Sequence, residues 1–368
     1  MRILQVLSGN AFHGAEAMTA ELIRQLHRLG VSVDIAVFDN AAPGNAEVFD
    51  AVGTAAAATF HIPCAGQLDL TALRELNRIV ADRHISIIHS HKYKTNFYGA
   101  LTRAIKPVKL LSTYHNWLYQ TPALRLYAAV DKRLARFSDL CVAVSKPVAD
   151  ELRRHVSAPK VLQIDNGIDT DVYRPSAGRA DAKSVLGLSP ERALIGFVGR
   201  LSAEKGLPCL IEALAGLATR NFDAIIVGDG ELRSDLEMQV SALGLAGRVT
   251  FLGARRDVHR IYQAIDIFVL PSTEEAFPMV LLEAMASGCA VIATAVGEVE
   301  RIVEIGESGL IVAPTKPEAI CQAIDCLLLD ARMRQRLGQA ARERVITSFS
   351  SRSMATAYLR SYERLDSM

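Results

Sequence analysis

The feature that most constrains the fold of this chain is a regular alternation of short apolar segments with longer amphipathic stretches. Most of the apolar segments are apolar on both faces: ILQVL, VSVDIAVF, ISIIH, KLLSTY and LCVAV in the first half, and ALIGFVG, AIIVG, RVTFLG, DIFVLP, AVIAT and GLIVA in the second. Strands of this kind are typical of parallel sheets that helices cover on both sides. The alternation therefore predicts an α/β fold of doubly wound, Rossmann-like parallel sheets.

The alternation breaks once, in the segment YRPSAGRADAKSVLGLSPE, which is rich in Pro, Gly, Ser and charge and is typical of an interdomain linker. A length of 368 residues fits two domains of ordinary size. We expect an N-terminal domain at residues 1–172, a linker at 173–190, a second domain at 191–345 and a C-terminal helix at 346–368. Because ligands bind beyond the carboxyl ends of parallel strands, we expect the active site in a cleft between the domains.

Composition and charge exclude several classes of protein. A net charge of +1 gives no overall basic field, so we expect no nucleic-acid partner. The six cysteines show no CxxC pairing and indicate small buried residues in a reducing compartment. No apolar stretch is long enough to span a bilayer, and MRILQVLSGN indicates a first strand rather than a signal peptide. We therefore expect a cytoplasmic protein, either free or peripheral at the membrane.

Two familiar nucleotide-binding motifs fail in this sequence. Gly9-x4-Gly14 follows the first apolar segment, but Ala15 and Glu16 stand where a P-loop needs Lys and Ser or Thr. The Gly228-Asp-Gly230 turn also follows a strand, but Arg233 occupies the position of the third glycine of GxGxxG. The sequence therefore disfavours a P-loop kinase and a nicotinamide-dependent dehydrogenase.

Four segments that follow strands of the second half carry the candidate chemistry. Arg200 and Lys205 flank a loop that leads into a helix, where two cations would neutralise a diphosphate. Glycines in IVGDGEL would allow close backbone approach to a ligand, and Arg255 follows the next strand. The alternative interpretation of the segment with Arg200 and Lys205 is an exposed basic loop. The alternative for the segment with Arg255 is a capped turn.

The fourth of these segments, residues 272–288, contains two glutamates. Glu283 stands in the otherwise apolar helix LLEAMA, where a carboxylate is costly to bury unless it is bonded. The two hydroxyls of a ribose would satisfy it. The backbone amides around residues 278–280 offer further donors to a phosphate, apart from Pro278 itself.

Taken together, GRLSAEKG, the Glu275-x7-Glu283 pair, EAMASG and NGID at residues 166–169 are very similar to the retaining glycosyltransferases of family 4, which have the GT-B fold. The resemblance covers nearly the whole chain. It implies that Arg200 and Lys205 hold the donor diphosphate, that Glu283 binds the ribose and that Glu275 contacts the transferred sugar. It also implies that the terminal helix crosses back to the first domain.

The resemblance implies a complete set of site residues. The expected catalytic residues are His115, Arg200, Lys205 and Glu275. The expected donor-binding residues are Gly14, Gly199, Arg200, Lys205, Gly228, Gly230, Glu231, Arg255, Glu275, Phe277, Pro278, Met279, Val280 and Glu283. No metal and no cofactor is expected besides the nucleotide-sugar co-substrate, because no Asp-x-Asp motif with an obvious role appears and the two cations would replace a metal ion.

The sequence departs from the family pattern at two places. The family usually has Gly-Gly-Ala/Met-Glu at the first turn, whereas this chain has His13-Gly14-Ala15-Glu16. The family usually has Glu-Gly-Phe-Gly, whereas here Ala276 and Pro278 take the places of the two glycines. Both residues restrict the backbone and proline removes one amide donor, so we expect altered sugar or phosphate geometry.

The acceptor side is less clear. We expect His13, Glu16, His91, Lys92 and Asn96 to bind the acceptor; a metal site at His89 and His91 is disfavoured because no carboxylate or cysteine is near in sequence. Residues 123–137 are amphipathic and basic, with Arg125, Lys132, Arg133 and Arg136. This pattern suits an anionic membrane surface that presents a lipid-linked acceptor. The alternative is a basic face on a helix packed against the sheet.

The expected function is a retaining, metal-independent hexosyltransferase that moves a sugar from a nucleotide-sugar donor to a glycan or lipid-linked acceptor in polysaccharide or glycolipid biosynthesis. The alternatives are a nucleotide-sugar epimerase on the same fold and a non-catalytic nucleotide-sugar-binding protein. An epimerase would convert the donor without an acceptor, which separates the two enzymes.

Overall fold

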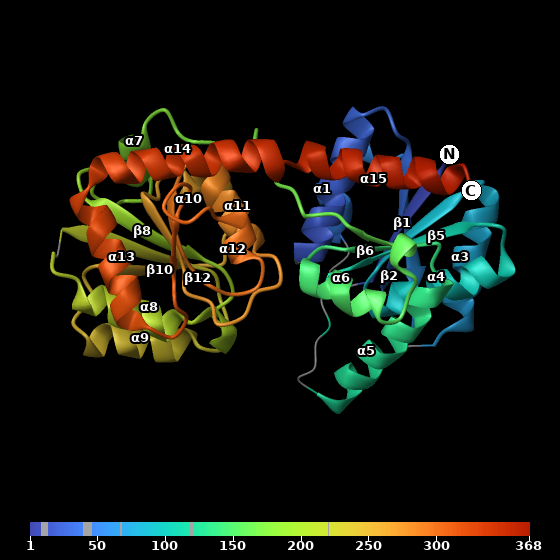
Figure 1. The fold of residues 1–368 in the computed structure, drawn as a ribbon, viewed down its shortest axis with the longest axis horizontal. Coiled ribbons are helices and arrows are strands. Elements are labelled where there is room, and N and C mark those ends of the chain that lie inside the picture. The colour runs from blue at the N-terminus through green and yellow to red at the C-terminus, as the bar shows by residue number, and fades with distance from the viewer. Residues whose placement is uncertain (9–13, 40–45, 67, 116, 118–120, 220) are drawn as a thin grey trace. The chain divides into compact units, whose positions relative to one another are not determined.

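The computed structural model describes residues 1–8, 14–39, 46–66, 68–115, 117, 121–219 and 221–368. The chain forms two compact units (Figure 1). The first unit combines Met1–Gly167 with Ser351–Met368, and the second consists of Ile168–Ser350. The C-terminal segment therefore belongs to the same unit as the N-terminus.

The first unit is built on a seven-stranded parallel sheet of order β3-β2-β1-β4-β5-β6-β7. Its strands are β1 (Ile3–Ser8), β2 (Val33–Asp39), β3 (Ala58–Pro63), β4 (Ile87–His91), β5 (Lys109–Tyr114), β6 (Leu140–Ala143) and β7 (Val161–Gln163). Its helices are α1 (Gly14–Arg28), α2 (Ala46–Val52), α3 (Leu70–Asp82), α4 (Lys92–Ile105), α5 (Pro122–Leu134), α6 (Lys146–Arg153) and α15 (Ser351–Asp366), with short 3-10 helices at Gly53–Ala55, Ala135–Phe137 and Ala158–Lys160.

Alternate residues of each strand in this sheet face opposite layers of helices. In β1, Ile3 and Leu7 pack in one cluster with side chains of α1 and α15, whereas Leu4 and Val6 pack in another with side chains of α3 and α4. Both clusters are buried, so the strands are apolar on both faces, as the sequence predicts. Gln5 is the exception in β1: it is polar, fully buried and on the face that α15 covers.

The second unit is built on a six-stranded parallel sheet of order β10-β9-β8-β11-β12-β13. Its strands are β8 (Ala193–Val198), β9 (Phe222–Val227), β10 (Val249–Gly253), β11 (Ile267–Leu270), β12 (Ala290–Thr294) and β13 (Leu310–Val312). Its helices are α7 (Arg179–Val185), α8 (Leu207–Gly216), α9 (Arg233–Ala242), α10 (Val258–Tyr262), α11 (Met279–Ala286), α12 (Val299–Ile302), α13 (Pro317–Leu329) and α14 (Ala331–Ser348), with a 3-10 helix at Ala203–Lys205.

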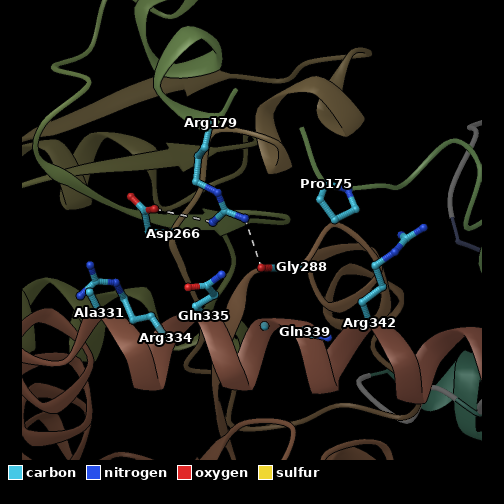
Figure 2. Close-up of a pocket in the computed structure, with 10 residues that line it drawn as sticks. Pro175, Arg179, Asp266, Gly288, Ala331, Arg334, Gln335, Gln339 and Arg342 are labelled. Carbon is cyan, nitrogen blue, oxygen red and sulfur yellow. Dashed lines mark hydrogen bonds and ion pairs between the residues drawn. The ribbon is translucent and has the colours of Figure 1, made fainter. Parts of the chain in front are cut away.

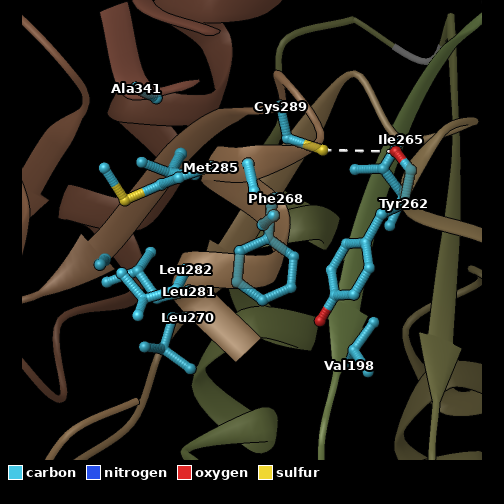
Figure 3. Close-up of a cluster of buried hydrophobic side chains, with 14 of the residues drawn as sticks. Val198, Tyr262, Ile265, Phe268, Leu270, Leu281, Leu282, Met285, Cys289 and Ala341 are labelled. Carbon is cyan, nitrogen blue, oxygen red and sulfur yellow. Dashed lines mark hydrogen bonds between the residues drawn. The ribbon is translucent and has the colours of Figure 1, made fainter. Parts of the chain in front are cut away.

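The second sheet is also covered on both faces. On one face, Phe268 and Leu270 of β11 pack against Leu281, Leu282 and other side chains of α10, α11 and α14 (Figure 3). On the other face, strand side chains pack with those of α8, α9 and α13. The prediction of two doubly wound parallel-sheet domains is confirmed. Helix α11, which carries Glu283, is held in place by its packing on this core.

The segment expected as a linker, residues 173–190, lies within the second unit and contains α7. Lys183 of α7 is buried and its ammonium contacts the carboxylate of Asp266 at 2.6 Å, while Arg179 donates to the backbone carbonyls of Ile265 and Gly288. The chain passes between the units at residues 167–168 and 350–351, not at 172–173 and 345–346. The charged residues Arg179 and Lys183, which indicated a solvated linker in the sequence, form polar contacts within the second unit.

Helices long and apolar enough to cross a bilayer are absent from the part of the chain that the structure describes.

Candidate functional site

The loops after β8 and β9 are held together by backbone hydrogen bonds. Gly199 N–H donates to the Val227 carbonyl at 2.9 Å, and Leu201 N–H donates to the Asp229 carbonyl at 3.0 Å. A Cβ atom at Gly228 would lie 1.8 Å from the Gly199 carbonyl oxygen, and one at Gly230 would lie 2.4 Å from that of Leu201. Loop packing therefore requires glycine at these two positions. The sequence analysis attributed these glycines to close approach of a ligand and did not include this reason.

The residues expected to bind the diphosphate and the sugar meet at the carboxyl edge of the sheet. Lys205 ends the 3-10 helix after β8, and its Nζ lies 2.7 Å from Oε1 of Glu275, which follows β11. Ser272 Oγ donates to the same carboxylate oxygen at 2.8 Å. The Glu275 side chain is only 9% exposed, and Lys205 and Ser272 supply polar partners for this largely buried carboxylate. Tertiary structure thus joins two residues seventy positions apart in the sequence.

Arg200 differs from Lys205 in its surroundings. It is exposed, directly follows the glycine that ends the β8 strand segment, and makes no hydrogen bond or ion pair with another residue in the described part of the chain. Its guanidinium therefore keeps all of its donors available to a ligand. A paired lysine and an available arginine lie on the same short segment, residues 200–205.

Glu283 lies partly buried on α11 and is bonded by a tyrosine. The Tyr262 hydroxyl donates to Oε2 of Glu283 at 2.9 Å. Burial raises the pKa of Glu283 to about 7, and hydrogen bonds from Tyr262 and Tyr173 oppose that rise. The sequence argument expected this carboxylate to need a partner, and the structure supplies a tyrosine. Tyr262 is a candidate site residue that the sequence analysis missed, because nothing in the sequence links it to α11.

The segment 277–280 forms the start of α11. Pro278 is the N-cap residue, with an extended backbone, and Met279 begins the helix. Phe277 is buried against the ring of Phe349, with ring centroids 6.1 Å apart. Val280 is half-buried, and its carbonyl accepts a hydrogen bond from Tyr262 at 3.3 Å. The amides of the first turn of α11 therefore begin at Met279.

Two of the expected donor-binding residues lie at the surface. Glu231 is exposed in the turn before α9. Arg255 forms a two-pronged ion pair with Asp257, with Nε to Oδ1 at 2.8 Å and Nη2 to Oδ2 at 2.7 Å. This pair fixes the guanidinium in the loop after β10.

In the first unit, Gly14 begins α1, and among the described residues no atom beyond its chain neighbours and its own helix backbone lies within 4 Å of where its Cβ would be. Glu16 in the same turn is buried, and its carboxylate is ion-paired with the ammonium of Lys92. Lys92 begins α4 in a left-handed conformation, with φ of 71°, which is unfavourable for any residue other than glycine. Of the other expected acceptor residues, His13 lies outside the described residues.

His115 follows β5 at the same edge of the first sheet. Its Nε2 lies 3.4 Å from Nδ1 of His91, and the two rings are stacked. Burial, and to a smaller extent the charge of Lys92, lower the pKa of His115 to about 3. The imidazole is therefore neutral at physiological pH.

His91 and Asn96 are less accessible than the sequence suggested. His91 is fully buried, and its Nε2 pairs with Oε1 of Gln5 at 2.8 Å. Asn96 is 2% exposed; its amide donates to Asp131 at 2.9 Å and its oxygen accepts from Ser90 at 2.7 Å. Their side chains hold the carboxyl ends of the strands in place, and the prediction that they bind the acceptor did not anticipate this burial.

A chain of buried hydrogen bonds continues from His91 to the C-terminal helix. Gln5 donates to the hydroxyl of Tyr362 at 3.0 Å, and that hydroxyl pairs with Nδ1 of His89 at 2.7 Å. His89 Nε2 in turn pairs with Thr113 Oγ1 at 2.7 Å. The sequence analysis missed Gln5 and Tyr362. The signal that could have found Gln5 is a polar residue inside the otherwise apolar segment ILQVL.

The basic residues of α5 do not share one face. Lys132 points inward: its ammonium pairs with Glu151 of α6 at 2.5 Å and lies 4.9 Å from the ring centroid of Trp117. Exposed side chains of this segment include both basic and large apolar residues: Arg125, Leu126, Tyr127, Val130, Arg133, Arg136 and Phe137. Of the four basic residues named from the sequence, Lys132 is thus committed to packing against α6.

Groups of three or more His, Cys, Asp or Glu side chains that could hold a metal ion are not found among the residues that the structure describes.

Each of the two units matches a known protein family. Residues 178–344 match the family model for glycosyl transferases group 1, and residues 12–172 match that for glycosyltransferase family 4. The chain is 30% identical over 260 residues to the lipopolysaccharide core biosynthesis mannosyltransferase LpsB of Rhizobium meliloti (strain 1021), covering 67% of this chain and 72% of the relative. It is 29% identical to a D-inositol 3-phosphate glycosyltransferase of Corynebacterium aurimucosum, covering 91% of this chain and 87% of the relative.

Solved structures share the fold. The crystal structure of Anabaena Alr3699/HepE in complex with UDP matches with a TM-score of 0.87 at 22% identity, covering 99% of this chain and 100% of that chain. Sucrose-phosphate synthase from Thermosynechococcus elongatus matches with a TM-score of 0.82 at 22% identity, covering both chains completely. The two parallel-sheet units, the two family models and the relatives agree: this chain belongs to the group 1 glycosyltransferases of family 4 and has the GT-B fold.

Proposed function

We propose that this glycosyltransferase moves a hexose-type sugar from a nucleotide-diphosphate donor to a glycan or lipid-linked acceptor, with retention of anomeric configuration and without a metal ion. The observation that carries the proposal is the contact between Lys205 and Glu275 at 2.7 Å, with the available guanidinium of Arg200 on the same short segment as Lys205. A cation for the phosphates and a carboxylate for the sugar hydroxyls lie side by side, as a sugar diphosphate requires.

The charges of the reaction support this assignment of roles. Breaking the bond between sugar and phosphate builds negative charge on the leaving diphosphate and positive charge on the anomeric carbon. Arg200 and Lys205 stabilise the first charge. On donor binding Lys205 exchanges its carboxylate partner for phosphate, and Glu275 accepts hydrogen bonds from the sugar hydroxyls. Attack on the same face as the leaving phosphate, with that phosphate taking the acceptor proton, gives retention.

We assign the other donor contacts by their places in the fold. Glu283 accepts hydrogen bonds from the ribose hydroxyls, and the amides of Met279 and Val280 face a phosphate at the start of α11. The described residues leave open the space where a side chain of Gly14 would be, and we assign this space to the donor. We assign Gly199, Gly228, Gly230, Glu231 and Arg255 to the loops that flank the nucleotide.

His115 is assigned to the reacting centre as a neutral hydrogen-bonding group. A charged imidazolium would oppose the positive charge that develops on the anomeric carbon, and the lowered pKa of His115 prevents this at physiological pH. The ion pair of Glu16 and Lys92 supports an acceptor role at the same edge of the first sheet. His13, His91 and Asn96 complete the proposed acceptor region, with the buried pair acting through its neighbours.

Two further features support a lipid-linked acceptor. The LpsB relative is named for lipopolysaccharide core biosynthesis. The segment at α5 exposes Leu126, Val130 and Phe137 beside Arg133 and Arg136, a combination that suits the interface of an anionic bilayer. We infer a peripheral position at the cytoplasmic membrane face. Loss of binding to anionic vesicles in a Leu126→Ser/Val130→Ser variant, with binding unchanged in Lys146→Ser, would be the expected result.

The nucleotide is tested first by thermal shift with UDP, GDP, ADP and dTDP, each with and without EDTA. A nucleotide that binds the folded protein raises its Tm by mass action. UDP is the first choice because the Anabaena structures were solved with UDP and UDP-glucose. We expect one nucleotide to raise Tm equally in EDTA, and Arg200→Ala to abolish that shift, whereas the exposed Arg352→Ala leaves it intact.

Turnover separates the proposed reaction from its alternatives. Removing Arg200 or Lys205 is expected to lower kcat by about a hundredfold or more, because a charge-stabilising donor at a leaving group contributes about 2.7–4 kcal/mol. Proton NMR of the first product reports the anomeric configuration, and inversion would contradict the proposed mechanism. Conversion of the donor without any acceptor would instead identify an epimerase, and binding without turnover a non-catalytic protein.

A further inference from the structure

The second unit contains a pocket of about 370 Å³ between α14 and the segment that leads into α7. Figure 2 shows Arg179 reaching down toward Gly288 on one side, and Arg334, Gln335 and Arg342 rising from α14 on the other. Pro175 closes the end near Arg342. A volume of this size lies in the range of ordinary small-molecule sites, which is about 300–1,000 Å³.

The pocket is separate from the proposed donor site. Asp266, which lines it, directly precedes β11, and Gly288 precedes β12. The donor residues Lys205 and Glu275 follow the carboxyl ends of β8 and β11. Because all strands of this sheet are parallel, the pocket lies at the opposite edge of the sheet. No role in the proposed transfer reaction accounts for it.

Two guanidinium groups of the pocket are anchored by neutral oxygens. Arg334 donates to the backbone carbonyls of Leu327 and Leu328 at the end of α13. Arg342 donates to the carbonyls of Tyr173, Thr170 and Ala286. Neither forms a carboxylate ion pair with the described residues. The carbonyls fix each guanidinium in place but leave its positive charge uncompensated.

The remaining charges around the pocket do not remove this excess. Asp266 is the acidic lining residue, and its carboxylate lies 2.6 Å from the Lys183 ammonium and 3.7 Å from Arg179. Burial lowers the pKa of Arg342, Arg174 lowers it further, and Asp171 offsets part of the effect. A partly buried guanidinium with a lowered pKa is a cation that lacks a full counter-charge. The pocket therefore favours an anion.

We propose that this pocket binds a small phosphorylated molecule of about the size of a hexose phosphate. Nε and Nη2 of Arg334 make no hydrogen bond with the described residues and can hold a phosphate in the two-pronged manner typical of guanidinium groups. The exposed side chain of Gln335, one residue along α14, offers an amide to the hydroxyls of the same molecule.

Isothermal titration calorimetry of the full chain tests the proposal, with glucose 6-phosphate, inorganic phosphate and glucose as probes. We expect glucose 6-phosphate to bind at one site per chain, inorganic phosphate to bind more weakly, and glucose not to bind. Arg334→Gln should weaken binding about tenfold or more, since a lost charged hydrogen bond contributes about 1.4 kcal/mol. The matched control is Arg332→Gln, an exposed arginine on the same helix outside the pocket lining.

Gln335→Glu is the second variant, because this exposed side chain has no hydrogen bond to lose within the described residues and the new charge should repel a phosphate. The Arg200→Ala/Lys205→Ala variant separates the pocket from the donor site. Binding that persists there supports the pocket even if the proposed donor site is wrong, and binding that disappears there overturns the inference. Absence of binding to wild-type protein, or equal binding by wild type, Arg334→Gln and Gln335→Glu, also overturns it.

Discussion

At the scale of a single residue, Glu283 links the proposed donor site to pH. Its carboxyl lies partly buried beside Tyr262, and burial raises its pKa to about 7. Below pH 7 the group takes up a proton, and a neutral carboxyl is a weaker acceptor for ribose hydroxyls than a carboxylate.

We therefore predict that nucleotide affinity falls as the pH is lowered from 8 to 6. Calorimetry of wild type and Glu283→Gln measures this change, and the variant should retain only the pH dependence of the nucleotide's own phosphate. Identical profiles for the two proteins would show that Glu283 does not bind the ribose.

Two glycines make a second residue-scale prediction because their surroundings differ. Beyond its chain neighbours and its own helix backbone, a Cβ atom at Gly14 would meet no atom of the described residues within 4 Å. One at Gly228 would lie 1.8 Å from a backbone oxygen, and the φ of Gly228 is 133°. Gly14→Ala should leave the free energy of unfolding unchanged and weaken donor binding, because the methyl group enters space that we assign to the donor.

Gly228→Ala should instead lower the free energy of unfolding by about 1–3 kcal/mol, because the backbone of two loops must move apart. Urea denaturation compares the two variants. Donor affinity that is normal in Gly14→Ala would remove Gly14 from the proposed site.

At the scale of elements, α15 is joined to the first sheet by buried polar contacts as well as by apolar packing. The Tyr362 hydroxyl bonds both Gln5 of β1 and His89 of β4. We predict that Tyr362→Phe leaves a buried donor or acceptor unsatisfied and lowers the free energy of unfolding by about 1–3 kcal/mol. Tyr127→Phe, at an exposed tyrosine of α5, is the control and should change stability little. Equal stability of both variants would show that the bond to Tyr362 contributes nothing net.

The elements themselves were predictable from sequence to different degrees. The apolar segments ILQVL, KLLSTY and AVIAT became strands, because a strand buried on both faces shows a continuous apolar run. The sequence indicated a linker at residues 173–190, whereas this segment contains α7 and belongs to the second unit. Its charged residues Arg179 and Lys183 bond with Gly288 and Asp266, which are distant in sequence. Local composition cannot distinguish a solvated charge from one whose partner lies some eighty residues away.

At the scale of the whole molecule, the two units should respond to acid in opposite ways. Burial lowers the pKa of His89, His91 and His115 in the first unit, so the unfolded chain binds protons there below pH 6.5 while the folded unit does not. Stability from these groups is therefore lost as the pH falls below 6.5. Asp131, with a pKa raised to about 6 by burial, opposes this loss in part.

In the second unit the sign is reversed for Glu283. Its raised pKa means that the folded state holds a proton between pH 4.5 and about 7 that the unfolded chain has lost, so its contribution to stability grows as the pH falls through about 7. We predict that the first unit unfolds at lower urea concentration at pH 5 than at pH 7, relative to the second.

Trp117 is the only tryptophan of the chain and lies in the first unit, so its fluorescence follows that unit, while circular dichroism follows both. Coincident transitions at pH 7 that separate at pH 5, with fluorescence changing first, are the expected result. A tryptophan transition that becomes more resistant to urea at pH 5 would contradict the assignment of the buried neutral histidines.

The sequence by itself determined the fold class, the family and the order in which the candidate residues follow their strands, because strand burial and the motifs around Arg200, Glu275 and Glu283 are local in the chain. Only the tertiary structure decided which of these residues meet. It paired Lys205 with Glu275, gave Glu283 a tyrosine, buried His91 and gathered the arginines of α14 around a pocket. The physical reason is that a charged or polar side chain has the same sequence signature whether water or a distant residue satisfies it, and only the folded chain supplies that partner.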